Sequence, residues 1–380
     1  MSLSFALSAE EEEFRSVVAT FADEVVAPAA EAFNAEARFP TEIVARMGEL
    51  GLFGIPFPVE YDGMGGDYLT LCLAIEELGR VDQSMGITLQ AGVGLGASPI
   101  ARFGTEEQKQ RWLPELCRGE RLGAFGLTEP SGGSDVAGAT RTRAVVDGDH
   151  WVIDGSKAFI TNAGTELTSI VTVTARTGDD EFTSIVVPAD TPGLTVAPAY
   201  RKVGWHASDT RELALDGVRV PLDHTLGDRG QGLRQFLQIL DDGRIAVAAL
   251  SVGMIQGCVD ECVRYASERE AFGKPISKQQ AVAFKIADLE VAAQTARHAY
   301  RYACWRKHEG LPYKREASVA KLYASEQAVT AAREACQVFG GAGFMTETRV
   351  GRFYQDAKIL EVGEGTSEIQ RLLIARDLGL

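Results

Sequence analysis

The sequence predicts a mainly helical α+β fold in three parts. These are an N-terminal helical domain over residues 1–120, a middle antiparallel β domain of barrel-like form over 121–230, and a C-terminal four-helix-bundle-like domain over 231–380. Apolar residues recur at helical spacing in the first and third parts, whereas alternating and β-branched runs dominate the second. The 380 residues also exceed the roughly 250–300 at which a single core stops growing.

The N-terminal domain is expected to consist of consecutive short helices. Ser8 and Glu11 have the spacing of a capping box, and apolar residues then recur at helical spacing as far as Val25. Pro28 marks a break or kink. Further helices are expected over residues 41–50, 68–81, 89–103 and, capped by Thr105 and Gln108, up to residue 118.

The middle domain begins where the composition shifts near Arg121. Strands are expected over residues 143–146, 151–153, 169–174, 183–187, 194–196 and 212–215, with a hairpin turn at 147–149. The glycine cluster Gly92–Gly96 follows no predicted strand, which argues against a doubly wound nicotinamide-binding fold.

The C-terminal domain is expected to be an antiparallel bundle, because three long helical patterns are joined by short links. The patterns cover residues 233–268, 277–308 and 315–339. Leu289, Ala293, Ala296 and Tyr300 form an apolar stripe that is predicted to lie in the bundle core.

The composition limits the possible partners. There are 53 acidic and 38 basic residues, which give a formal net charge of −15, and no run of Lys and Arg. This balance argues against a nucleic-acid or anionic-membrane partner, since both need a basic surface. No apolar run approaches the ~20 residues of a membrane span, and residues 1–13 are acidic and lack the apolar segment of a signal peptide.

Metal-binding patterns are also missing. The six cysteines have no CxxC spacing and the five histidines form no HExxH pattern, so no metal site is expected. Scattered cysteines of this kind are typical of small buried residues in a reducing cytoplasm.

A glycine-bracketed carboxylate near the C-terminus is the main candidate for chemistry. Gly363 and Gly365 flank Glu364 between two helical patterns, and Thr366 or Ser367 can cap the second helix. The backbone around this carboxylate is flexible and has no bulky neighbour. The alternative is a glycine C-cap followed by an N-cap, with Glu364 merely solvated.

Five stretches, taken together and in this order, resemble the acyl-CoA dehydrogenase family. They are residues 127–135, 159–162, 269–273, 337–343 and 364–371. The resemblance covers essentially the whole chain. It implies FAD as the cofactor, an acyl-CoA substrate, an electron-transfer flavoprotein as the electron acceptor, and a homo-oligomer, usually a dimer of dimers.

The first two stretches are implied to surround the flavin ring. Leu127, Thr128, Gly133 and Ser134 are assigned to the flavin loop, with Ser134 also near coenzyme A. Phe159, Ile160 and Thr161 are assigned to the ring, where relatives often have Trp in place of the Phe. Without the resemblance, the loop would be interpreted as an ordinary turn and the second stretch as strand core.

The third and fourth stretches are implied to serve the FAD of a neighbouring subunit. Arg269 and Phe272, predicted to end the first bundle helix, are assigned to the pyrophosphate region, where a guanidinium fork suits a diphosphate. The same resemblance assigns Gln280, Gln337, Gly341, Thr366 and Glu368 to the cofactor. The alternative for Arg269 is a cation at a helix C-terminus.

Asp241, Arg244, Gly363 and Gly365 are implied to line the acyl-CoA channel. A minority of relatives carry their catalytic carboxylate just before the Arg, where this chain has Gly243, so the resemblance implies Glu364 as the base. The alternative for Asp241 and Arg244 is an acidic first turn and a surface arginine.

The implied reaction is α,β-dehydrogenation of an acyl-CoA to the 2-enoyl-CoA. Glu364 takes the α-proton and FAD N5 accepts the hydride. The alternatives are an acyl-CoA oxidase of the same fold and an inactive acyl-CoA-binding homologue.

Residues 84–96 are expected to form the floor of the acyl pocket. Their glycines suggest either room for the acyl chain or close helix packing. Gly363 stands where relatives often have Tyr, which predicts space for branched acyl groups.

Overall fold

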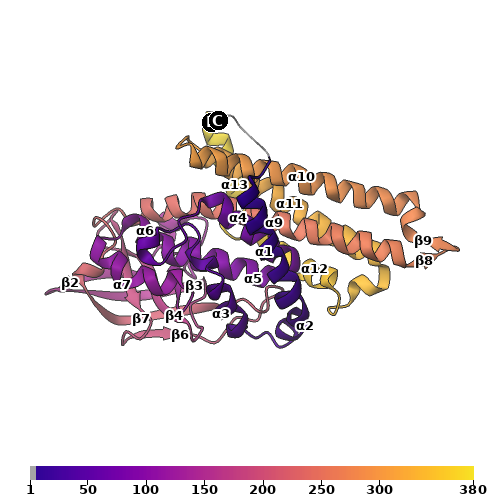
Figure 1. The fold of residues 1–380 in the computed structure, drawn as a ribbon. Helices are drawn as coiled ribbons and strands as arrows, with labels where there is room; N and C mark the ends of the chain where they lie inside the picture. Colours follow the sequence, from indigo (N-terminus) through magenta and orange to yellow (C-terminus); the bar gives the residue numbers. More distant parts are fainter. Residues whose placement is uncertain (1–5) are drawn as a thin grey trace.

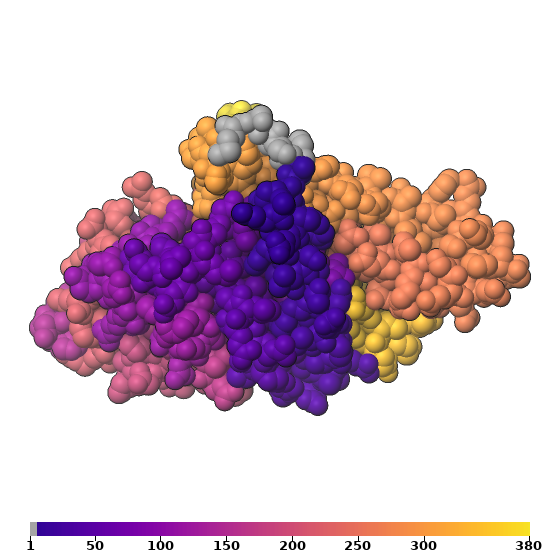
Figure 2. Space-filling model, in the orientation of Figure 1, coloured from indigo at the N-terminus to yellow at the C-terminus, as the bar shows by residue number. Residues whose placement is uncertain are grey.

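The structure is a computed structural model that describes residues 6–380, so residues 1–13, which are expected not to form a signal peptide, lie partly outside the described residues. Helices of the first part, a sheet and a long helical bundle follow one another along the chain, which confirms the mainly helical α+β class. Figure 1 shows the sheet at one end of the molecule and the bundle extending to the opposite end, where β8 and β9 lie. The space-filling view in Figure 2 shows the N-terminal helices packed between these two parts.

The N-terminal helices follow the predicted pattern, and both capping boxes are confirmed. Pro28 lies in the first turn of a helix that continues the first one through a π-helical turn, so the chain does not break there. The elements are α1 (Ala9–Phe21), η1 (Ala22–Val26), α2 (Ala27–Ala35), α3 (Thr41–Glu49), η2 (Leu52–Gly54), η3 (Val59–Tyr61), α4 (Tyr68–Val81), α5 (Gln83–Gln90), η4 (Ala91–Ala97), α6 (Ser98–Phe103) and α7 (Glu106–Cys117).

The prediction of a single helix over residues 89–103 is wrong, because this stretch is divided among α5, the π-helical η4 and α6. Its glycines mostly permit close packing. A Cβ at Gly92 would lie 2.8 Å from the Phe53 ring, and one at Gly96 would lie 2.6 Å from the Gly123 carbonyl. At these two positions, packing explains the missing side chain and pocket space does not.

A seven-stranded sheet forms the middle part, in the order β1-β4-β2-β3-β7-β6 with β5 on β4. Its strands are β1 (Leu122–Gly126), β2 (Arg143–Asp147), β3 (His150–Thr161), β4 (Thr168–Arg176), β5 (Phe182–Pro188), β6 (Leu194–Val196) and β7 (Thr210–Pro221), with the short helix α8 (Val136–Ala139) after β1. The β2–β3 hairpin is confirmed, with Asp147 opposite His150. The sheet is not wholly antiparallel, because β1 runs parallel to β4.

Strand β1 escaped the sequence analysis for a physical reason. All five of its residues are buried, so they lack the alternation by which a half-buried strand is recognised. Gly123 is needed where the strand passes the Gly96 backbone, since a Cβ at Gly123 would lie 2.9 Å from the Gly96 Cα. The local sequence therefore resembles a glycine-containing loop.

The bundle is built by α9 (Gly232–Glu268), α10 (Gln280–His308) and α11 (Lys314–Phe339), with α12 (Arg349–Leu360) packed on α11 and α9 and α13 (Ser367–Asp377) on α11. Small elements join them: η5 (Leu222–His224), β8 (Glu270–Ala271), β9 (Lys274–Pro275), η6 (Ile276–Lys278) and η7 (Gly340–Phe344). The stripe of Leu289, Ala293, Ala296 and Tyr300 is buried, as predicted. By length and composition α9 could cross a membrane, but 83% of its apolar window is buried inside the fold.

Helix α4 packs closely on α9 and joins the first part to the bundle. Glycines on α9 make this approach possible: a Cβ at Gly253 would overlap the Glu76 carbonyl, and one at Gly257 would overlap the Arg80 carbonyl. The second half of α9 is thereby fixed against α4.

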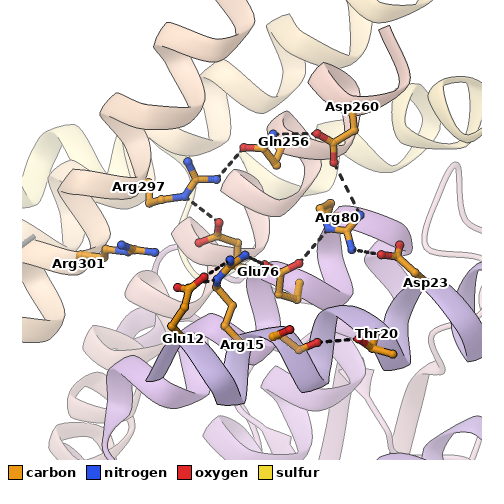
Figure 3. A network of polar contacts seen from close by, with 12 residues as sticks. Glu12, Arg15, Thr20, Asp23, Glu76, Arg80, Gln256, Asp260, Arg297 and Arg301 are labelled. Carbon is orange, nitrogen blue, oxygen red and sulfur yellow. Dashed lines mark hydrogen bonds and ion pairs between the residues drawn. The ribbon is translucent and has the colours of Figure 1, made fainter. Parts of the chain in front are cut away.

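A polar network closes the same junction (Figure 3). The buried Glu76 carboxylate accepts hydrogen bonds from Arg297 Nε at 2.8 Å and from Tyr300 Oη at 2.5 Å. Its neighbour Glu77 accepts from Arg15 Nη1 at 2.7 Å and from Arg80 Nε at 2.9 Å. Because both carboxylates are nearly buried, these partners are needed to offset the loss of water.

Tyr300→Phe should lower the free energy of unfolding by about 1–3 kcal/mol, because a buried carboxylate loses one of its donors. Tyr302→Phe on the same helix is the matched control, since within the described residues 6–380 its hydroxyl accepts only from the partly exposed Arg306. Urea unfolding of both variants measures the difference. Equal, small losses would contradict a stabilising role for the Tyr300–Glu76 bond.

Candidate active site

The Glu364 turn connects α12 to α13, which confirms the predicted helix, break and second helix. Glu364 and Gly365 both have positive φ angles, +55° and +95°. Thr366 caps α13, with its hydroxyl accepting a bond from the Ile369 N–H at 3.4 Å. A positive φ is unfavourable for a glutamate, so the surrounding contacts must hold the turn in this conformation.

Two buried side chains hold the turn. Lys321 Nζ on α11 donates to the Gly365 carbonyl at 2.8 Å. Gln370 Nε2 on α13 donates to the same carbonyl at 2.8 Å and to the Glu364 carbonyl at 3.2 Å. Both side chains are fully buried, so these bonds are shielded from water. Neither role was predicted: Lys321 stands outside the five stretches, and Gln370 lies in the stretch 364–371 without an assigned role.

The Glu364 side chain points inward, so the alternative of a solvated carboxylate is wrong. Its Oε2 is buried and has no hydrogen-bond partner among residues 6–380. A Cβ at Gly243 on α9 would lie 2.6 Å from this oxygen. The carboxyl therefore occupies space that is available only because position 243 is glycine.

Burial raises the pKa of Glu364 from 4.5 to about 7, while Arg244, Lys321 and the Gln90 amide act in the opposite direction. Burial also lowers the pKa of the Lys321 ammonium to about 8. Arg244 is nearly buried and forms an ion pair with Asp241, whose own pKa is raised by burial. A carboxyl with a pKa near neutrality can both take up and release a proton under ordinary conditions.

Asp241 and Arg244 lie in the interior of α9, which begins at Gly232, so the alternative of an acidic first turn is wrong. Asp242, which lies between Asp241 and Gly243, was not predicted to have a role. It nevertheless fixes this part of the helix. Its carboxylate accepts from Lys307 Nζ at 2.8 Å and from Tyr313 Oη at 2.7 Å. Sequence alone could not show this, because the donors come from distant elements.

A cavity of about 440 Å³ opens beside Asp241. Arg234 and Lys314 line it, and neither forms an ion pair with any residue in the described range 6–380. Phe182 and Leu237 give the same cavity an apolar part. The carboxylates of Asp180 and Asp241 line it too, so the cavity offers charges of both signs beside an apolar part.

The loop after β1, which is predicted to bind the flavin, is anchored by a buried ion pair that was not predicted. Lys157 Nζ contacts Glu129 Oε1 at 2.7 Å, and Glu129 Oε2 also accepts from the Arg141 N–H at 2.6 Å. Leu127 is buried at the base of this loop, whereas Gly133 and Ser134 are exposed. The loop therefore presents accessible backbone from a rigid base.

The second predicted stretch lies at the end of β3. Phe159 has a φ of +61°, is 65% exposed and packs against Tyr200 with ring centroids 5.2 Å apart. Thr161 is half-buried, whereas the Ile160 side chain is buried in the sheet core. The exposed aromatic ring on a strained backbone indicates a binding role and argues against strand core.

The remaining predicted cofactor residues mostly gather at the outer end of the bundle, near β8 and β9 (Figure 1). Arg269 is the C-cap of α9, but Phe272 does not end that helix; it lies in the β8–β9 turn and is 95% exposed. Gln280 at the start of α10 and Gln337 and Gly341 at the end of α11 are exposed as well. Thr366 and the exposed Glu368 lie instead beside the Glu364 turn.

A buried carboxyl on a held turn, an accessible loop on a rigid sheet, and this order of parts are the features that the resemblance to flavoenzymes acting on acyl thioesters implies. Three family models match the chain: the acyl-CoA dehydrogenase N-terminal domain over residues 8–120, the middle domain over 124–218 and the C-terminal domain over 230–379. The chain belongs to the acyl-CoA dehydrogenase family.

Individual relatives match along nearly the whole chain. Probable acyl-CoA dehydrogenase YngJ of Bacillus subtilis (strain 168) is 48% identical, with 99% of this chain and 100% of that protein covered. Butyryl-CoA dehydrogenase from Megasphaera elsdenii has a TM-score of 0.96 at 36% identity, covering 100% of both chains. A structure described as the electron transferring flavoprotein of Acidaminococcus fermentans has a TM-score of 0.96 at 39% identity, covering 99% of both chains. An acyl-CoA dehydrogenase complexed with FAD from Bacillus anthracis has a TM-score of 0.91 at 31% identity, covering 98% of this chain and 67% of that one.

The cofactor of this family is FAD, and the residues present fit it. Arg269 forms no ion pair with any residue from 6 to 380, which leaves its guanidinium free for a diphosphate. A Cβ built at Gly340 or Gly341 would meet nothing within 4 Å, so the backbone there is open to a ligand.

Glu364→Gln should make the stability of the fold less dependent on pH. The raised pKa means that the folded state holds this proton more tightly than the unfolded state, so the carboxyl destabilises the fold as pH rises from 4.5 to about 7. The variant should match the wild type near about pH 4.5 and exceed it by up to about 3 kcal/mol above about pH 8. Urea unfolding at both pH values measures the difference in free energy of unfolding between the variant and the wild type. Glu347→Gln, at an exposed glutamate, is the control. A difference that does not change with pH would contradict the raised pKa of Glu364.

Proposed function

We propose that this chain dehydrogenates an acyl-CoA to the 2-enoyl-CoA, with Glu364 as the base that removes the α-proton. The observation that carries the proposal is the buried Glu364 carboxyl, with a pKa raised to about 7, on a turn held from two helices. An α-proton is weakly acidic, and a carboxylate freed from water is a stronger base than a solvated one.

The thioester needs a second group that stabilises charge on its carbonyl oxygen. The Glu364 backbone N–H donates to no residue in the described range, so it is free to donate to that oxygen. Lys321 and Gln370 hold the carbonyls of the same turn and so fix the direction of this N–H. When bound, FAD supplies the hydride-accepting chemistry.

The loop and end-of-bundle residues are assigned to FAD in two groups. Leu127, Thr128, Gly133, Ser134 and the stretch 159–161 bind the flavin half, with Leu127 and Ile160 contributing backbone because their side chains are buried. Arg269, Phe272, Gln280, Gln337 and Gly341 bind the FAD of a neighbouring subunit, because they lie at the opposite end of this chain from the sheet (Figure 1). This division requires at least a dimer, and we infer a dimer of dimers.

The electron acceptor is inferred to be an electron-transfer flavoprotein, as the likeness to the Acidaminococcus fermentans structure supports. The six cysteines form no disulfide bonds, which supports a reducing cytoplasm as the location.

The substrate channel includes Asp241 and Arg244, with Gly363 and Gly365 beside the base. A Cβ at Gly363 would meet only the Ile359 carbonyl, at 3.4 Å, outside its chain neighbours, so branched acyl groups have room there.

Glu364→Gln should retain FAD and the fold but lose at least about 100-fold in the rate of flavin bleaching by an acyl-CoA, because positioned base catalysis contributes at least that much. Anaerobic stopped-flow absorbance measures the rate, and Glu347→Gln is the control. Near-normal bleaching in the Glu364 variant would refute the assignment. Rapid reoxidation of the bleached wild type by air would favour the oxidase alternative.

We assign Arg234 and Lys314 to the phosphates of coenzyme A, which lie far from the reacting carbons. Arg234→Ala combined with Lys314→Ala should therefore raise KM for acyl-CoA roughly 10-fold or more and leave kcat nearly unchanged. The matched control is a substrate, the corresponding acyl-pantetheine, which lacks those phosphates. Its KM should not change. An equal effect on both thioesters would show that the two residues act on the fold or on the acyl group.

A further inference from the structure

A lysine inside the sheet has a partner for each of its three ammonium protons. Lys157 in β3 is fully buried, and its Nζ donates to Glu129 Oε1 at 2.7 Å and to the Thr174 carbonyl at 2.8 Å. The third acceptor is the Leu127 carbonyl, at 3.3 Å. The lysine stem passes Gly126, where a Cβ would lie 3.3 Å from Lys157 Cγ. Lys157 therefore contacts the backbone of the loop after β1 directly.

The contact with Leu127 acts on the peptide that joins this residue to Thr128. The carbonyl of this peptide belongs to Leu127 and its N–H to Thr128. That N–H donates to no residue in the described range 6–380, and Thr128 is only partly buried. The next carbonyl, that of Thr128, accepts from the Ala158 N–H at 2.9 Å. The peptide is thus held through its carbonyl by Lys157, while its N–H is free for a ligand.

The Glu129 carboxylate balances the charge of the lysine. It is 3% exposed and also accepts from the Arg141 N–H at 2.6 Å and from the Thr142 N–H at 3.1 Å. Burial lowers the pKa of Lys157 to about 8, and Glu129 limits this fall, so the ammonium is mostly charged at pH 7. Apolar residues of similar volume often stabilise a fold as well as a buried ion pair does. Packing alone therefore does not explain the pair.

We propose that Lys157 is a positioning residue that sets the orientation and donor strength of the Thr128 N–H and thereby raises the reduction potential of the bound flavin. A cation that donates to a peptide carbonyl polarises the N–H of the same peptide, because hydrogen bonds in series strengthen one another. A stronger donor favours the flavin ring more after it has gained electrons than before. The inference rests on the proposed function, which assigns Thr128 to the flavin.

The two charges of the pair give the test a sign. Lys157→Met removes the cation and should lower the midpoint potential of FAD, whereas Glu129→Gln leaves the cation unbalanced and should raise it. Each variant should change the relative affinity for reduced and oxidised FAD by at least tenfold, which is about 30 mV for a two-electron couple. Reductive titration of the FAD-loaded enzyme against a reference dye, without acyl-CoA, measures the potential.

Glu76→Gln is the matched control, because Glu76 is a similarly buried carboxylate, 4% exposed, that pairs with Arg297 at the junction of α4 with the bundle. This variant should unfold at a lower urea concentration and keep the wild-type potential. Removing one partner of a buried pair is strongly destabilising. The double variant Lys157→Met, Glu129→Gln has no unpaired charge and serves if a single variant does not fold. Its potential should fall below that of the wild type, because only the ammonium can donate to the Leu127 carbonyl.

A purely structural role for the pair would weaken the binding of oxidised and reduced FAD alike and leave the potential unchanged. Shifts of the same sign in the two single variants, or a wild-type potential in the double variant, would therefore overturn the proposal. If acyl-CoA bleaches the wild-type flavin but these shifts are missing, this inference alone fails. Opposite shifts in an enzyme that no acyl-CoA bleaches would support this inference and remove the proposed function alone.

Discussion

The contact between the Glu364 carboxyl and the bare backbone of α9 at Gly243 is the constraint on which the site depends. The two partners come from separate helices, so every element that positions either of them also positions the chemistry. On the α9 side, Asp242 ties the helix to Lys307 and Tyr313, and the glycines that face α4 fix its depth. On the other side, Lys321 and Gln370 hold the turn. A shift of α9 would therefore open or close the space around the base directly.

Strained backbone occurs at three of the residues assigned to ligands. Phe159, Phe272 and Glu364 are among the few non-glycine residues in the described chain with positive φ, and each projects a side chain that a relaxed backbone would aim elsewhere. Each is braced by a rigid neighbour: the sheet for Phe159, the β8–β9 pairing for Phe272, and the two buried donors for Glu364. Such residues lower stability locally, and the bulk of the bundle and sheet offsets this cost.

How much of this could be predicted from the sequence depends on the range of each interaction. Helix α4, both capping boxes and the β2–β3 hairpin follow from residues a few positions apart, and they were predicted. Strand β1 was missed because burial on both faces removes alternation. Lys321 and Asp242 were missed because their partners lie on distant segments, and an isolated lysine or aspartate has the same local pattern whether it is buried or solvated. Gly243 was predicted to matter, but only through the family resemblance; the contact with Glu364 gives the physical reason.

The two cations nearest the base explain why its pKa stays near neutrality. A free ammonium or guanidinium at this depth would form an ion pair with Glu364 and hold its pKa low. Here Arg244 is paired with Asp241, and Lys321 donates to the Gly365 carbonyl, so neither neutralises the carboxyl. Their charges still lower the pKa of Glu364 from a distance, which limits the rise that burial alone would cause. The Asp241 carboxylate and the Gly365 carbonyl thus tune the base by keeping the nearby cations occupied, and Glu364 Oε2 is left unpaired for a proton.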